Sequence, residues 1–181
     1  NVPCPFSANV KTARQKHLMR QAVDRAGLSN PKYKLAYNWE EVEKAAQEIG
    51  YPLVLKPVDL ASSAFVKLIQ TSNDLQQAYR DLENFPLNFR DQERERAFLL
   101  EEYICGEEVS VETVSNNGEI TVVGITDKSV TGSPYFIENG HMFPAKLDED
   151  VKEEIGDYVR NVLLATGYDH GIAHTEIKLT K

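Results

Sequence analysis

Hydrophobic positions along the chain follow two spacings, one typical of helices and one typical of strands. Four segments carry apolar residues three or four positions apart, which predicts amphipathic helices. The predicted helices are residues 13–26, 39–49, 72–80 and 148–166. Asn38 stands before the second helix with Glu41 three residues later, a spacing that predicts a capping box. Glycines then end three of the four helices, as is common at helix C-termini.

Short apolar or alternating segments between these helices predict strands. The predicted strands are residues 51–57, 65–69, 97–103, 109–114, 119–127 and 171–180. No helix separates the first two strands, so they predict a hairpin, and Asn116-Asn117-Gly118 predicts the turn of another. We expect 86–96 to be an exposed connection and 131–147 to be a long loop without regular structure. Helices and hairpins in this order predict an α+β fold rather than a doubly wound parallel sheet.

The length and charge of the chain limit the function classes that it can serve. Its 181 residues are enough for one sizeable domain or two small lobes. The net charge of −8 argues against a general surface for nucleic acids or acidic membranes. No apolar run approaches the ~20 residues of a membrane span. Two cysteines are too few for a disulfide scaffold, so we expect a cytoplasmic protein. The ends at Asn1 and Lys181 suggest a fragment of a longer protein.

Familiar nucleotide and zinc motifs are missing from the sequence. It contains no Gly-Lys pair, which excludes a Walker-type phosphate loop, and no G-x-G-x-x-G follows a strand. His174-Thr175-Glu176 has the H-x-E spacing of zinc deaminases, but the required pair of cysteines is absent.

Candidate phosphate-binding groups begin with Lys56, which interrupts an apolar strand. A charge in such a position is costly unless an anion meets it. The loop that follows contains Ser62 and Ser63, whose hydroxyl and backbone N–H groups can surround phosphate oxygens. The alternative for Lys56 is a solvent-facing strand edge, and the sequence alone favours neither reading.

Acidic residues follow the apolar strand at 97–103. A strand that ends in Glu101-Glu102-Tyr103-Ile104 and then turns offers backbone groups to an adenine edge, and an acid just beyond can accept from ribose hydroxyls. Glu108, Ser110 and Glu112 share one face of the next strand, and His174, Glu176 and Lys178 share one face of the last. A solvated strand face is the simpler explanation for alternating acids.

The order of these features resembles the ATP-grasp superfamily over essentially the whole chain. The resemblance rests on Lys16 in a helix, Lys56 in a strand, the small-residue loop 59–65, the Glu101–Ile104 segment and Glu176 in the last strand. Within the superfamily, Glu138-Asn139-Gly140-His141-Met142-Phe143-Pro144 and Gly171–Glu176 are most similar to the carboxylate–amine ligases that join amino acids.

The resemblance implies a fold and a division of the chain. An ATP-grasp fold has two small α+β lobes, each with an antiparallel sheet and flanking helices, and the nucleotide lies between them. On this basis residues 1–30 form an entry segment and helix, 31–97 a small lobe with the phosphate loop, and 98–181 a larger lobe that is truncated at its C-terminus.

The resemblance also implies binding roles, which are expectations for this sequence. The expected ligands of ATP are Lys16, Lys56, Ser62 and Ser63 at the phosphates, Glu101, Tyr103 and Ile104 at adenine, Glu108 at ribose, and Lys128 at phosphate or substrate. The alternative for Lys128 is an exposed lysine without a binding role. Glu176 is the expected ligand of Mg²⁺, for which Mn²⁺ can substitute. The segment 138–144 would border the carboxylate substrate. The family's second acidic ligand and its Asn and Arg would follow Lys181, so no catalytic residue is assigned.

The implied activity is an ATP-dependent ligation of a carboxylate, an amino acid, to an amine through an acyl phosphate, with release of ADP and phosphate. Its partners would be small molecules, and the resemblance is compatible with a homodimer of the full-length protein. One departure is that loop 59–65 lacks the glycines usual in the family, although Ala and Ser can present N–H groups in ordinary φ/ψ. The alternatives are a non-catalytic nucleotide-binding module and an ATP-grasp phosphotransferase. Alone, the fragment is expected to bind nucleotide and catalyse little.

Overall fold

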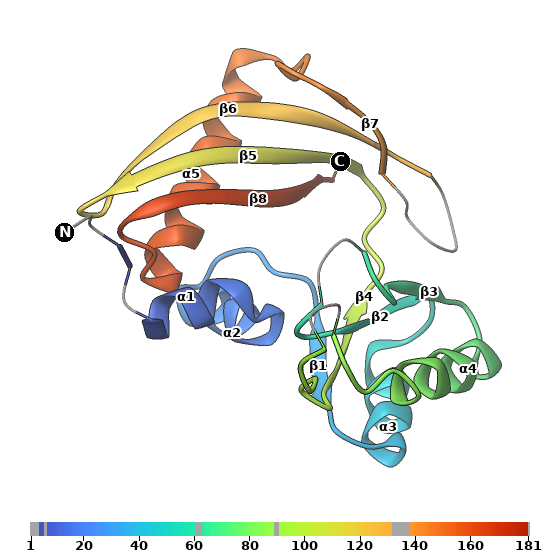
Figure 1. Ribbon diagram of the computed structural model, residues 1–181. Helices are drawn as coiled ribbons and strands as arrows, with labels where there is room; N and C mark the ends of the chain where they lie inside the picture. The colour runs from blue at the N-terminus through green and yellow to red at the C-terminus, as the bar shows by residue number, and fades with distance from the viewer. Residues whose placement is uncertain (1–3, 6, 61–62, 89–90, 132–137, 181) are drawn as a thin grey trace. The chain divides into compact units, whose positions relative to one another are not determined.

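The computed structural model describes residues 4–5, 7–60, 63–88, 91–131 and 138–180. Contacts divide the chain into two compact units (Figure 1). Unit 1 contains the described residues of 1–30, 105–130 and 138–181, and unit 2 contains the described residues of 31–104 together with Thr131. The expected division was an entry segment at 1–30, a small lobe at 31–97 and a larger lobe at 98–181. In the structure residues 98–104 group with unit 2, and the described residues of 1–30 group with unit 1.

Unit 2 is a four-stranded antiparallel sheet with two helices, in the strand order β1-β4-β2-β3. Its elements are β1 (Tyr33–Ala36), α3 (Trp39–Ile49), β2 (Leu53–Pro57), β3 (Lys67–Ile69), α4 (Ser72–Glu83) and β4 (Phe98–Glu102). The predicted hairpin is confirmed, because β2 pairs antiparallel with β3. The apolar stripes of α3 and α4 pack on one face of the sheet, where Leu53, Leu55 and Leu100 are almost fully buried.

The caps of the two helices in unit 2 follow from the sequence. Asn38 accepts a hydrogen bond from the backbone N–H of Glu41 at 2.9 Å, as predicted. The Glu41 carboxylate accepts in return from the backbone N–H of Tyr37 rather than from that of Asn38. Helix α4 has a complete capping box between Thr71 and Asp74, which satisfies two of the N–H groups that a helix start leaves unpaired.

Unit 1 is a second four-stranded antiparallel sheet, in the order β7-β6-β5-β8, with α5 across one face (Figure 1). Its elements are α1 (Ser7–Arg14), α2 (Lys16–Arg25), β5 (Glu107–Asn116), β6 (Glu119–Val130), β7 (Glu138–Met142), α5 (Glu149–Thr166) and β8 (Gly171–Leu179). Val109 and Val111 of β5 pack with Val159 of α5 in the core. Asn117 and Gly118 form the predicted hairpin turn with positive φ values of 51° and 81°. The predicted α+β fold with antiparallel sheets is confirmed.

Three elements were not predicted. Helix α1 and strand β1 are short and lack a clear apolar period. Their stability therefore comes from contacts with neighbouring elements and not from a local sequence pattern. Strand β7 lies where we expected an irregular connection, so that prediction was wrong. Its residues are mostly exposed, and pairing with the edge of β6 holds it in place. Over the described residues, none of the helices combines the length and apolar character needed to traverse a bilayer.

Candidate functional site

Lys56 lies on the face of the unit 2 sheet that is opposite the helices. Its ammonium contacts the carboxylate of Glu101 at 2.5 Å across the β2–β4 pair. The exposed fractions of the two side chains are only 15% and 7%. An unpaired charge in such a place would be costly, so each group stabilises the other. The alternative of a solvent-facing edge lysine is wrong, because Lys56 lies in a central pair of the sheet and is largely buried.

The loop after β2 adopts backbone conformations that are rare for its residues. Ser63 has φ 53° and Phe65 has φ 57°, which is the left-handed region usually occupied by glycine. The expectation that Ala and Ser would work there in ordinary φ/ψ is therefore wrong for Ser63. Ser62 lies outside the described residues. Each such conformation costs of order 1 kcal/mol or more, so surrounding contacts must hold it.

Two contacts hold the ends of this loop. At its start the Asp59 carboxylate accepts from the backbone N–H of Glu95 at 2.9 Å and lies 3.5 Å from the guanidinium of Arg94. At its end the ring of Phe65 packs on that of Phe85, with centroids 4.7 Å apart. The connection 86–96, expected to be exposed, thus contributes a buried arginine that supports the loop.

The end of β4 is tied to strands on both sides. The Glu102 carboxylate accepts from the backbone N–H of Lys32 at 2.7 Å, and the N–H of Tyr103 donates to the carbonyl of Pro52 at 3.4 Å. These contacts position the half-buried residues Tyr103 and Ile104. One carboxylate oxygen of Glu101 is used by Lys56. The adenine-binding roles of Glu101, Tyr103 and Ile104 stay predictions.

In unit 1 the polar side chains collect on the face of the sheet that α5 does not cover. The alternating burial of β8 confirms that His174, Glu176 and Lys178 point one way and that Ala173 and Ile177 point into the core. In the antiparallel register Glu108 faces both Lys128 and Lys178. Likewise Ser110 pairs with Glu176, and Glu112 pairs with His174, whose Nδ1 lies 2.6 Å from the Glu112 carboxylate. These acids are therefore not a simple solvated face, because they contact neighbouring polar side chains.

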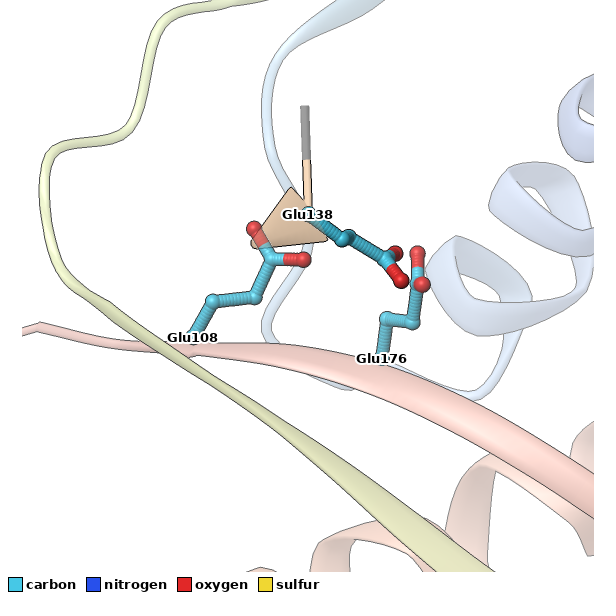
Figure 2. A group of neighbouring side chains, drawn as sticks. All are labelled: Glu108, Glu138 and Glu176. Atoms are coloured by element: carbon cyan, nitrogen blue, oxygen red, sulfur yellow. The ribbon is translucent and has the colours of Figure 1, made fainter. Parts of the chain in front are cut away.

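Lys128 of β6 lies at the centre of a carboxylate cluster, defined as Glu108, Glu138 and Glu176. Its ammonium is 3.0 Å from Glu108 and 2.6 Å from Glu138, and it also contacts Glu176. The Lys128 side chain is 1% exposed, whereas the Glu176 side chain is 53% exposed. Figure 2 shows the three glutamates pointing toward one another from β5, β7 and β8.

The electrostatics of this cluster explain the perturbed titration of its members. Burial lowers the pKa of Lys128, but hydrogen bonds to Glu138, Glu176 and Glu108 outweigh burial and raise the pKa well above its usual value. The hydrogen bond from Lys128 lowers the pKa of Glu138. Three carboxylates whose oxygens lie within 4.8 Å of one another repel, because like charges at this spacing interact unfavourably. The ammonium is what lets them stay together.

The carboxylate cluster fits a divalent cation by its donor chemistry. One oxygen from each glutamate lies within 4.8 Å of the others, and a cation, the Lys128 ammonium, already stands among them. Magnesium prefers oxygen ligands and needs only one or two carboxylates when water and phosphate complete its shell. Glu176 was expected as a ligand from the sequence. Glu138 was not, because it lies in the stretch that we expected to be irregular, and the segment 138–144 was expected only to border the carboxylate substrate.

The remaining predicted residue, Lys16, is the first residue of α2 in unit 1 and is half-buried. Glu108, Lys128 and Glu176 are thus brought together in unit 1, and Lys56 and Glu101 in unit 2.

Comparison with known proteins adds a family and several relatives. Residues 49–181 match the family model described as the ATP-grasp domain. The alanine–anticapsin ligases of Bacillus amyloliquefaciens and Bacillus subtilis are 33% identical over 94% of this chain. The chain spans only 39% of the length of these relatives.

Solved structures agree on the fold. An L-amino acid ligase from Bacillus licheniformis superposes with a TM-score of 0.80 at 26% identity, over 100% of this chain and 40% of that one. The biotin carboxylase domain of the 2-oxoglutarate carboxylase of Hydrogenobacter thermophilus, solved with MgADP, gives a TM-score of 0.80 at 20% identity, over 96% of this chain and 38% of that one. The second likeness concerns the fold alone.

Proposed function

The chain belongs to the ATP-grasp domain family, and on that premise we propose that it is the nucleotide-binding part of an ATP-dependent ligase that joins an amino acid carboxylate to an amine. The observation that carries the proposal is the convergence of Glu108, Lys128, Glu138 and Glu176 on the open face of the unit 1 sheet. The names of the relatives support it, since both the alanine–anticapsin ligases and the L-amino acid ligase act on amino acids.

The proposed reaction has two steps. A carboxylate oxygen of the first substrate attacks the γ-phosphorus of ATP, the bond to the bridging oxygen breaks, and ADP leaves with that electron pair. The nitrogen of the second substrate then attacks the acyl carbon, phosphate leaves, and the nitrogen loses a proton. The sum is one amide, ADP and phosphate for each ATP.

The residues of this chain serve mainly to bind and orient the reactants. Lys16 and Lys56 neutralise phosphate oxygens as point charges, and Ser63 offers its backbone N–H at the loop tip. Glu101 with the backbone of Tyr103 and Ile104 takes adenine.

In unit 1, Glu108 accepts from ribose, and Lys128 takes phosphate or substrate. Glu176, with Glu138 beside it, would hold magnesium, which when bound offsets the charge that develops on the phosphate oxygens. These roles need no covalent help from the protein, because positioning and charge neutralisation supply most of the catalysis of phosphoryl transfer.

The products test this proposal. The full-length protein that contains this chain, given ATP, Mg²⁺ and pairs of amino acids, should release ADP and phosphate in a one-to-one ratio with amide product. Stoichiometric AMP and pyrophosphate would contradict the acyl-phosphate mechanism.

A second candidate is a nucleotide-binding module without catalysis, which the loop conformation favours. A loop without glycine that carries Ser63 and Phe65 at positive φ is held in one strained shape and is less free to rearrange around phosphate. A Ser63→Gly variant of the full-length protein distinguishes the two. If the protein is a ligase, the turnover of Ser63→Gly equals or exceeds that of the unmodified protein. If the protein is a non-catalytic module, it binds ATP but produces no ADP with either Ser or Gly at position 63, whatever amino acids are offered.

A further inference from the structure

Lys128 occupies the position among the three glutamates that a metal ion would need. It is the most buried of the four side chains, at 1% exposed, while the carboxylates around it are 19%, 39% and 53% exposed. A lysine ammonium has three N–H donors and no acceptor. Each donor can therefore take one of the three carboxylates, which come from three different strands, β5, β7 and β8.

The register of the sheet makes this meeting possible. Lys128 stands directly opposite Glu108 on β5, and Ser110, the next residue of β5 on that face, stands opposite Glu176 on β8. On the other side of β6, strand β7 brings Glu138 within 2.6 Å of the ammonium. A single side chain on β6 therefore fixes the carboxylates of the three other strands of the sheet.

Other basic groups lie at the rim of the carboxylate cluster. Lys178 is 3.5 Å from Glu108, His141 is 3.3 Å from Glu138, and His174 is 3.7 Å from Glu176. Each touches only one glutamate of the cluster, within the described residues, and His174 also contacts Glu112, whereas Lys128 touches all three members. Loss of Lys128 would leave three negative charges with these peripheral partners alone.

A divalent cation and the ammonium cannot share these oxygens. Magnesium binds carboxylate oxygens at about 2.1 Å, so it would stand where the ammonium stands and repel it. We propose that Lys128 is the resident counter-ion of the carboxylate cluster, holding Glu108, Glu138 and Glu176 together in the metal-free protein, and that a divalent cation displaces it from Glu138 and Glu176. Lys128 is in this sense a positioning residue. The inference rests on the proposed function in taking Glu176 as a metal ligand.

Displacement also gives Lys128 a second position. Once a divalent cation has replaced it at Glu138 and Glu176, the ammonium loses these two carboxylate partners and becomes available to a phosphate group. Metal binding thereby precedes the phosphate contact of Lys128, which couples nucleotide affinity to the metal through this chain's own residue.

The test measures the binding of Mn²⁺ to the chain in the absence of nucleotide, with the concentration of free Mn²⁺ read by electron paramagnetic resonance. Lys128→Met removes the competitor and raises the local charge, so it should bind Mn²⁺ at least tenfold more tightly than the unmodified chain. Lys67→Met is the matched control, because Lys67 pairs with Asp81 in unit 2 and its loss changes the net charge equally. That control should bind Mn²⁺ as the unmodified chain does. Equal, weaker or undetectable Mn²⁺ binding by Lys128→Met overturns the proposal.

A second measurement needs no variant and so does not depend on whether Lys128→Met folds. Acetic anhydride should modify Lys128 slowly in the metal-free chain and at least several-fold faster in millimolar Mn²⁺, as read by peptide mass spectrometry. Unchanged reactivity of Lys128 in Mn²⁺ overturns the proposal. Since neither measurement contains ATP, a failure of the proposed ligase activity leaves both results valid and separate.

Discussion

Removal of the Lys56 ammonium should destabilise unit 2, because the buried carboxylate of Glu101 loses a positive charge that contacts it. In Lys56→Met the Glu101 side chain, 7% exposed, would keep its negative charge without the ammonium that contacts it at 2.5 Å. Breaking a buried ion pair by removing one partner costs about 3–5 kcal/mol. Because the Lys56 side chain is 15% exposed and water reaches it, we expect the lower end, about 3 kcal/mol.

Urea unfolding followed by tryptophan fluorescence measures this loss. Trp39 is the single tryptophan of the chain and packs against the unit 2 core, 5.4 Å from the ring of Tyr79, so its signal reports that unit. With an m-value of about 2 kcal/mol/M, the midpoint should fall by about 1.5 M urea. Lys34→Met is the matched control, since its partner Glu48 and Lys34 itself are 42% and 51% exposed, so its loss should leave the urea midpoint almost unchanged.

A double variant separates the loss of the Lys56–Glu101 contact from the effect of the negative charge that remains on Glu101. Lys56→Met with Glu101→Met replaces both partners by apolar groups of similar size and should recover to within about 1 kcal/mol of the unmodified chain. The reasoning is refuted if Lys56→Met costs no more than Lys34→Met, or if the double variant is no more stable than the single one.

Three further predictions concern binding, packing and pH. Lys56→Ala should weaken ATP binding by calorimetry more than Lys128→Ala does, and equal losses would mean that the phosphates lie elsewhere. Gly106→Ala should lose about 1–3 kcal/mol of unfolding free energy, because a Cβ there would lie 2.1 Å from the backbone oxygen of Leu179. Gly140→Ala, whose Cβ would meet nothing closer than 3.6 Å, should lose little, and equal losses would contradict the close approach. The hydrogen bond from Lys67 lowers the pKa of Asp81 in the folded protein. The ion pair therefore stabilises the fold above the unfolded-state pKa of Asp81, near 3.9, and this stabilisation is lost as the pH falls through the pKa of Asp81 in the folded state. Asp81→Asn should therefore be less stable by about 0.2–1 kcal/mol at pH 7, and a gap that persisted below the folded pKa would exclude this cause.

Much of the fold followed from local pattern. The stripes of α3, α4 and α5 and the alternation of β8 each have an apolar side that can be read from spacing, because burial of that side is what stabilises the element. Strand β7 could not be found in this way. Its sequence Glu-Asn-Gly-His-Met has no alternating apolar residues, and its stability comes from backbone pairing with β6, which the apolar pattern of the segment does not show.

The candidate site shows the same division between local and long-range information. The face shared by His174, Glu176 and Lys178 was predictable, since the side-chain period of a strand is local. The contacts of Lys128 with glutamates on three other strands depend on sheet order and register, neither of which local spacing determines. The positive φ of Ser63 was also unpredictable, because serine prefers other conformations and the tethers at Asp59 and Phe65 are tertiary.

Calorimetric titration of ATP into this chain, with and without Mg²⁺, tests whether the chain binds ATP together with a metal ion at Glu176. ATP binding should weaken clearly when Mg²⁺ is removed, and it should weaken to a similar extent in Mg²⁺ when Glu176 is replaced by Gln. The exposed carboxylate variant Glu48→Gln should bind ATP as the unmodified chain does. No ATP binding, or binding that ignores both Mg²⁺ and Glu176→Gln, would contradict the account.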